Sequence, residues 1–189
     1  CIEDMALMRI IPETTVIAPA DDVATYALVM KLAEHKGLSY MRLTRPNLPR
    51  IYPEGESFEI GKAKVLKKGT QATIVATGSL VWPSLQAADI LAEEGISIGI
   101  IDMHTVKPMD SKPVIEAAKR TGFIVTAEEH TVIGGLGEAI ASLLAEHHPT
   151  RIKRIGIRDR FGESGSCDEL MDFFGFTPQA IAKEIKEAL

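Results

Sequence analysis

Hydrophobic residues in the first part of the chain follow two helical and two extended patterns. Apolar positions at helical spacing predict a short helix over residues 2–10. Runs of β-prone residues predict strands over 15–18 and 39–43, and a longer helix between them is predicted to begin at a cap formed by Asp21 or Asp22. This order is typical of the end of a parallel α/β domain, and so short a segment buries too little surface to fold alone.

A segment without either hydrophobic period follows. Residues 46–59 carry three prolines and a glycine among charged side chains, which predicts a linker. Beyond it strands alternate with helices, which favours a mostly parallel sheet with helices on both faces. We therefore expect an α/β fold in three parts, with a partial domain over 1–45, the linker over 46–59 and a complete domain over 60–189. The strands expected in the complete domain span 63–66, 72–76, 98–103, 123–127 and 152–157, and its helices span 82–94, 111–120, 137–147, 168–174 and 178–189.

Composition narrows the possible partners. Hydrophobic residues make up 46% of the chain and charged residues 25%, the balance of a globular protein rather than a disordered one. The net charge is −5 and no basic run occurs, so neither nucleic acid nor a membrane is expected as a partner. The two cysteines, Cys1 and Cys167, suit a reducing compartment, and we expect a cytoplasmic protein. Because the chain starts inside an amphipathic pattern without a Met, we expect it to be a piece of a longer protein.

Arg45 is the first candidate for a binding residue. It follows the strand predicted over 39–43 and precedes Pro46, so it is predicted to lie at the carboxyl end of the strand, where open α/β sheets bind ligands. A guanidinium at this place, ahead of a proline that restricts the backbone, suits bidentate binding of a phosphate. Spacing alone leaves a second interpretation open, in which Arg45 caps the sheet edge or pairs with a nearby carboxylate.

Two further motifs surround the end of the strand predicted over 123–127. Glu128, Glu129 and His130 end this strand, and a carboxylate beside an imidazole can act as an acid–base pair. Because neighbouring strand residues point to opposite faces, a structural or interface role is favoured. Residues 134–137, Gly-Gly-Leu-Gly, precede a helix and could bind an anion through backbone N–H groups, but a tight turn with close packing is favoured.

Three other segments are interpreted as structural. Residues 162–166, Gly-Glu-Ser-Gly-Ser, lack the final glycine of the G-x-S-x-G nucleophile turn and follow a polar run, which excludes a serine hydrolase. Two histidines at 147–148 end a helix without a cysteine or carboxylate at ligand spacing, so no metal site is expected. Residues 102–110 are predicted to form a loop, with Asp110 or Ser111 capping the next helix.

Five segments, taken in order, resemble the C-terminal part of the transketolase family. Each is unspecific alone, but the ordered set is specific and runs essentially from one end of the chain to the other. The segments are EDMALMR (3–9) with Pro12, APAD (18–21), RLTRPNLP (42–49), EEH (128–130) with GGLG (134–137), and FGESG (161–165).

This resemblance implies a fold, a reaction and partners. Residues 1 to about 50 correspond to the end of the family's pyrimidine-binding domain, and the rest to its C-terminal domain, which has no established catalytic residue. Transketolases move a two-carbon ketol unit between sugar phosphates with thiamine diphosphate and a divalent metal such as Mg²⁺. The arginine matched by Arg45 holds the substrate phosphate, so that role is carried over to Arg45. The implied partners are a second copy, forming a homodimer, and an N-terminal cofactor-binding domain or subunit.

The sequence also departs from the family. A Gly-Pro-Thr-His segment, whose histidine contacts substrate, precedes the position of Cys1 in the family, and the glutamate that activates the cofactor lies further upstream. Neither is in this sequence, so we expect the chain alone neither to bind thiamine diphosphate nor to turn over. Cys1 itself stands where many relatives have glutamine. No catalytic, cofactor-binding or metal-ligating residue is predicted, and Arg45 is the single predicted site residue.

Three alternatives remain open. Deoxyxylulose-phosphate synthase (1-deoxyxylulose-5-phosphate synthase) shares this architecture, but it leads us to expect a tyrosine and a glycine around the arginine, where this chain has Leu43, Thr44 and Pro46. The β subunits of 2-oxo-acid dehydrogenases share it too, but typically lack the Asn-Leu-Pro continuation found here at 47–49. The third alternative is a non-catalytic module for dimerisation and assembly onto a cofactor-bearing subunit.

Overall fold

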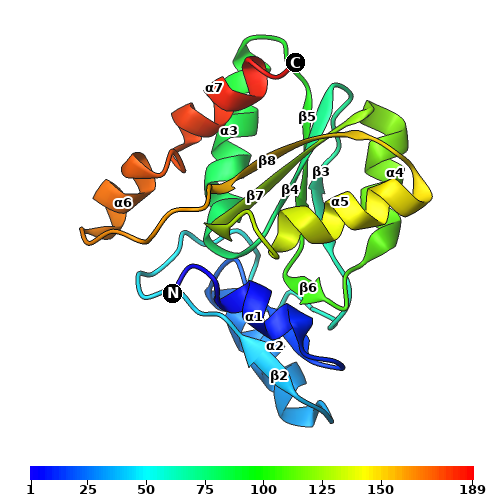
Figure 1. The fold of residues 1–189 in the computed structure, drawn as a ribbon, viewed down its shortest axis with the longest axis vertical. Coiled ribbons are helices and arrows are strands. Elements are labelled where there is room, and N and C mark those ends of the chain that lie inside the picture. Colours follow the sequence, from blue (N-terminus) through cyan, green and yellow to red (C-terminus); the bar gives the residue numbers. More distant parts are fainter.

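The computed structural model describes all 189 residues, which form two sheets of unequal size (Figure 1). In chain order the elements are α1 (Asp4–Ile10), β1 (Thr15–Ile17), α2 (Asp22–Glu34), β2 (Ser39–Met41), β3 (Lys64–Lys67), β4 (Ala72–Ala76), η1 (Gly78–Leu80), α3 (Val81–Glu93), β5 (Ile98–Asp102), β6 (Thr105–Lys107), α4 (Ser111–Thr121), β7 (Phe123–Thr131), α5 (Leu136–His147), β8 (Arg151–Ile157), α6 (Cys167–Phe173) and α7 (Pro178–Lys186). The smaller sheet has the strand order β2-β1-β6, and the larger sheet has the order β3-β5-β4-β7-β8. Only the edge strand β3 runs antiparallel to its neighbour in the larger sheet.

Helices cover both faces of the larger sheet. On one face α3 and α7 pack together, and Leu91 and Ile181 share a hydrophobic cluster with Ile74 of β4. On the other face α4 and α5 pack together, and Ile140 shares a second cluster with Val75, the next residue of the same strand. None of the helices is long and apolar enough to span a membrane. The predicted α/β fold, a mostly parallel sheet with helices on both faces, is confirmed.

The predicted loop over 102–110 is wrong in two respects. Asp110 stands at the N-cap position of α4 but makes no side-chain cap hydrogen bond, and its Oδ2 accepts instead from the N–H of Ala63 at 3.2 Å. The segment also contains the short strand β6, which pairs antiparallel with β1, with Thr105 opposite Ile17 and Lys107 opposite Val16. β6 is an edge strand of the small sheet, and its residue Thr105 is fully buried. Three residues are too few to show a period of two, and the partner strand lies far away in the sequence. The smaller sheet therefore needs a strand from the second half of the chain.

The segment 46–59, which we expect to connect the two units, forms neither helix nor strand, and it is mostly exposed except for two buried aromatic residues. Tyr52 and Phe58 are 5% and 2% exposed and share a hydrophobic cluster with Leu28 of α2. Their rings meet edge to face, with centroids 4.8 Å apart. The segment is therefore fixed against the first unit, and it is also bonded to the larger sheet through Tyr52.

That bond is a buried pair between Tyr52 and Asp102. The Tyr52 hydroxyl donates to Asp102 Oδ2 at 2.6 Å, and the Asp102 side chain is fully buried at the end of β5. Burial raises the pKa of Asp102 to about 7, although the hydrogen bond from Tyr52 acts against this shift, and Asp21 and Lys64 are the other charged groups that influence it. The second oxygen, Oδ1, and the buried His104 Nε2 have no partner. Burial lowers the pKa of His104 to about 4, so its ring is neutral at pH 7.

We predict that Asp102→Asn removes part of the pH dependence of stability. Because the folded pKa is about 7 and the ordinary value is 3.8, the folded state holds a proton that the unfolded state releases, so stability falls as pH rises from 4 through 7. The free energy of unfolding of the parent should fall relative to Asp102→Asn by about 1–3 kcal/mol over this interval. Urea unfolding at pH 4, 6 and 8 measures this difference.

Asp89→Asn is the matched control for that experiment. Asp89 is an exposed carboxylate that forms a surface ion pair with Lys67, and such a pair contributes little to stability. The control should keep the slope of the parent. An Asp102→Asn protein with the parent's slope would show that Asp102 is ionised at low pH in the folded chain, contrary to this account.

Candidate functional site

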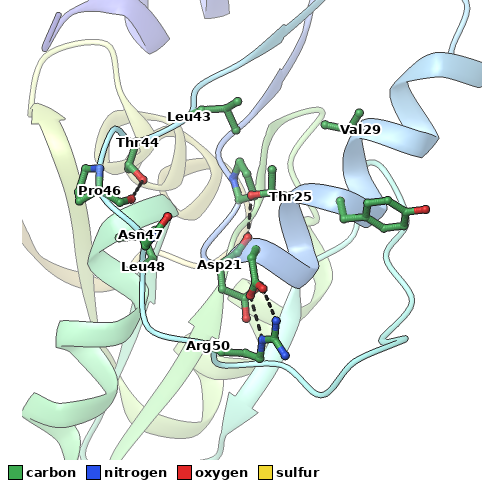
Figure 2. A pocket seen from close by; sticks show the side chains of 12 residues that line it. Asp21, Thr25, Val29, Leu43, Thr44, Pro46, Asn47, Leu48 and Arg50 are labelled. Carbon is green, nitrogen blue, oxygen red and sulfur yellow. Dashed lines mark hydrogen bonds and ion pairs between the residues drawn. The ribbon is translucent and has the colours of Figure 1, made fainter.

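The loop of residues 43–50 forms one wall of an open cavity of about 780 Å³. Figure 2 shows this loop facing the first half of α2 across the cavity. Polar and apolar side chains share the lining. Those from the side of β1 and α2 are Pro19, Asp21, Asp22, Thr25, Tyr26 and Val29, and those from the loop are Leu43, Thr44, Pro46, Asn47, Leu48 and Arg50.

Arg45 lies in this loop, four residues beyond the end of β2 rather than at the strand end itself. Its side chain is exposed and does not line the cavity, although both its neighbours, Thr44 and Pro46, do. Arg50, by contrast, donates through Nε to Asp22 Oδ1 at 3.1 Å, while Arg45 makes no side-chain hydrogen bond or ion pair. The pairing with a local carboxylate that the spacing left open is therefore not formed.

Arg42 holds the start of the loop. Its backbone N–H donates to the carbonyl oxygen of Ile17 at 2.8 Å, which continues the pairing of β2 with β1 by one residue. Its guanidinium donates through Nη1 to the carbonyl oxygen of Glu129 in β7 at 2.7 Å, and Nε lies 3.3 Å from Asp4 Oδ2 in α1. The residue thus joins three elements. No pattern in the sequence marks it, and sequence reasoning missed its role.

Asp21 holds the end of the loop. Its Oδ1 accepts from the N–H of Ala24 at 2.7 Å, which makes it the N-cap of α2. Its Oδ2 accepts from the N–H groups of Ile51 and Tyr52, both at 2.8 Å, and the residue is 2% exposed. The cap is one of the two that the sequence predicted. The second contact was missed because it joins residues about 30 positions apart, beyond the reach of any local pattern.

Glu128 occupies the N-terminus of α5. Its buried carboxylate accepts from the N–H groups of Leu136 at 2.7 Å and Gly137 at 2.8 Å. A Cβ on Gly135 would lie 2.0 Å from Glu128 Oε2, so this approach requires glycine. Burial raises the pKa of Glu128 to about 7, while the two N–H bonds act against that shift. The close packing favoured for 134–137 is confirmed, and the N–H groups bonded to Glu128 are not available to an external anion.

His130 and Glu129 connect β7 to other elements. His130 Nε2 accepts from the N–H of Ala6 in α1 at 3.3 Å, and Nδ1 donates to a backbone carbonyl oxygen at 2.7 Å; burial lowers the pKa of this ring. Glu128 lies on the same face, with Oε2 3.6 Å from His130 Nδ1, whereas Glu129 points away and accepts from the hydroxyl of Ser79. None of the three lines the cavity beside Arg45. The structural role that the sequence favoured is the one observed.

The remaining candidates do not form a metal site. No group of three or more His, Cys, Asp or Glu side chains is close enough to hold a metal ion. Ser166 caps α6, where it exchanges hydrogen bonds with Glu169, and Cys1 and Cys167 are free and exposed. Since Glu128 already occupies the N-terminus of α5, that helix end does not fit a diphosphate. No cofactor step is therefore assigned to these residues.

The sequence matches a known family over most of its length. The profile described as transketolase, C-terminal domain, matches residues 61–181. A putative transketolase C-terminal section from Methanocaldococcus jannaschii is 44% identical over 190 residues, covering 99% of this chain and 59% of the relative. A 6-deoxy-6-sulfo-D-fructose transketolase subunit from Clostridium sp. (strain MSTE9) is 42% identical, covering 98% of this chain and 58% of the relative.

Solved structures agree with this match. A split-gene transketolase, described as an inactive β4 tetramer, superposes with a TM-score of 0.96 at 42% identity and covers 100% of this chain and 62% of its own. A transketolase variant from Pichia stipitis in complex with fructose 6-phosphate has a TM-score of 0.76 at 26% identity, covering 99% of this chain and 27% of its own. The chain spans about three fifths of the length of the two relatives described above. It belongs to the transketolase family, and it is similar throughout to the C-terminal section of that family's proteins.

Proposed function

We propose that this chain is the C-terminal section of a transketolase and contributes the substrate phosphate contact to an active site completed by an N-terminal cofactor-bearing partner. The complete enzyme transfers a two-carbon ketol unit between sugar phosphates, with thiamine diphosphate and Mg²⁺ held outside this chain. One observation carries the proposal. Arg45 presents an exposed guanidinium without an internal partner, on a loop held at both ends beside a cavity.

The charges of the loop support an anionic group on the substrate. The loop over 43–50 carries two cations, and Arg50 is already paired with Asp22. Arg45 is therefore the cation free to bind, and a guanidinium binds two oxygens of a phosphate side by side. A sulfonate offers a similar set of oxygens, and a sulfonated sugar appears in the name of the Clostridium relative. Phosphate is our proposal, and a sulfonated donor is the alternative if the assembled enzyme does not use the phosphorylated one.

Replacing Arg45 with alanine is expected to lower kcat/KM for xylulose 5-phosphate about 10- to 100-fold, since a charge-assisted contact contributes about 1.5–3 kcal/mol. The assay measures ketol transfer from xylulose 5-phosphate to ribose 5-phosphate by the complete enzyme assembled with its cofactor-bearing partner. With xylulose, which has no phosphate, the same substitution should change kcat/KM little. The informative result is the ratio of kcat/KM for xylulose 5-phosphate to kcat/KM for xylulose.

Arg50→Ala is the control within the same loop. It removes an exposed ion pair that solvent screens, so kcat/KM should change less than about threefold. Equal losses from both variants, or an Arg45→Ala loss that is the same for xylulose, would contradict the phosphate role. No ketol transfer by the assembled parent would instead favour 1-deoxyxylulose-5-phosphate synthase, a 2-oxo-acid dehydrogenase β subunit or a sulfonated donor.

The isolated chain is expected to be inactive and to bind no thiamine diphosphate. Its residues offer no metal-binding group, and Glu128 fills the N-terminus of α5. Isothermal titration of thiamine diphosphate with Mg²⁺ into the 189-residue chain should therefore give only heat of dilution. The same titration into the chain mixed with its N-terminal partner is the positive control. Micromolar binding by the isolated chain would contradict this division of roles.

Assembly is the second function we propose, and an exposed apolar surface on α2 favours it. Tyr26, Val29 and Met30 are 73%, 45% and 52% exposed there, and Leu43 beside them is 58% exposed. Such a patch marks a contact surface rather than a solvated one, and the homologous split-gene protein is described as a β4 tetramer. We expect a homodimer or a larger even assembly of the 20.5 kDa chain by light scattering. A stable monomer would count against this surface, and Val29→Glu should weaken any assembly that forms through it.

A further inference from the structure

The two oxygens of Asp21 have different tasks. Oδ1 accepts from the N–H of Ala24 and caps α2, whereas Oδ2 accepts from the N–H groups of Ile51 and Tyr52. The cap of α2 does not require the bonds from Oδ2 to Ile51 and Tyr52. We infer that Asp21 is a positioning residue, which holds the loop over 43–50 so that Arg45 meets the substrate phosphate. This inference rests on the proposed function of Arg45.

The backbone of the loop transmits this constraint to Arg45. Ile51 lies six residues beyond Arg45, and the intervening Pro46 and Pro49 each fix one backbone dihedral. The turn around Arg45 is closed by a hydrogen bond from the hydroxyl of Thr44 to the carbonyl oxygen of Pro46 at 3.2 Å. A short stiff segment can place a side chain only if both of its ends are fixed. Asp21 fixes the far end.

The near end is fixed independently. Arg42 is bonded to the carbonyl oxygen of Glu129 at 2.7 Å and lies 3.3 Å from Asp4 Oδ2. Between the two ends the loop makes one exposed ion pair, that of Arg50 with Asp22. Such a pair is weak because solvent screens it, whereas Asp21 is 2% exposed and its bonds are formed away from water. The buried carboxylate is therefore the stronger of the two contacts at the far end.

A substitution can separate the two tasks of Asp21. Serine caps helices about as well as aspartate, and this chain already uses a hydroxyl in that way, since Thr177 accepts from the N–H of Ala180 in α7. Serine is too short to reach the N–H groups of Ile51 and Tyr52. Asp21→Ser therefore keeps the cap and releases the loop.

The test is a double-substitution cycle in the complete enzyme with its cofactor-bearing partner. Asp21→Ser should raise KM for xylulose 5-phosphate about 3- to 10-fold, with little change in kcat and little change in either constant for xylulose. In the Arg45→Ala background it should add almost nothing, because a residue that acts through Arg45 has no effect once Arg45 is absent.

Two further variants guard against a merely structural explanation. Thr177→Ala removes a helix cap far from the loop, so it should lower thermal stability and leave the ratio of KM values for the two donors unchanged. If Asp21→Ser does not fold, Asp21→Asn takes its place. The amide has the same shape, but its single oxygen can serve either Ala24 or the loop and not both. Asparagine should therefore raise KM for xylulose 5-phosphate relative to the parent and leave KM for xylulose unchanged, while a thermal melt reports any loss of the cap.

The outcomes distinguish this inference from the proposed function. Suppose that Arg45→Ala is selective for the phosphorylated donor. If Asp21→Ser then raises KM equally for both donors, or if its effect adds fully to that of Arg45→Ala, Asp21 acts only on stability and the inference is overturned. If Arg45→Ala is not selective, the phosphate role and the positioning role are both wrong. If Asp21→Ser and Asp21→Asn leave both donors unchanged, the loop keeps its place without the carboxylate, and the inference again is overturned.

Discussion

Buried carboxylates that accept backbone N–H groups fix the parts of this molecule that regular secondary structure does not. Asp21 joins the start of α2 to the end of the loop over 43–50, and Glu128 joins β7 to the start of α5. In both cases the acceptor satisfies helix N–H groups that would otherwise be without a partner in a dry environment. Asp102 is a third buried carboxylate, and it accepts from the hydroxyl of Tyr52 instead of from a backbone N–H. The N–H of the same tyrosine is bonded to Asp21. Of these carboxylates, Asp21 lines the cavity beside the loop.

Further contacts connect the loop and the small sheet to the second half of the chain. The small sheet is completed by β6 from the second half of the chain, and Arg42 at the start of the loop bonds to the backbone of β7. Lys107 at the end of β6 donates to the carbonyl oxygens of Arg9 and Ile11. The second half of the chain thus completes the small sheet and bonds to the start of the loop. In the proposed function, this part of the chain contributes to catalysis by fixing the position of the loop.

Much of the fold could be predicted from the sequence, because its helices and longer strands have clear periods and caps. The strand β6 could not, since three residues show no period and its partner β1 is remote in the chain. Arg45 was singled out by its predicted place at a strand end, and its role was carried over from the resemblance, yet the strand stops at Met41, four residues earlier. The second role of Asp21 depends on a contact between segments about 30 residues apart, which no local pattern encodes. The cap at Asp21 was predictable from its own helix, whereas the contacts that build the site are tertiary.

The most direct measurement is a crystal structure of the complete enzyme, assembled with its cofactor-bearing partner, in complex with xylulose 5-phosphate. The account predicts that two nitrogens of the Arg45 guanidinium lie about 2.7–2.9 Å from two phosphate oxygens, with the Asp21 bonds to Ile51 and Tyr52 kept. A phosphate bound elsewhere, with Arg45 directed into solvent, would contradict it.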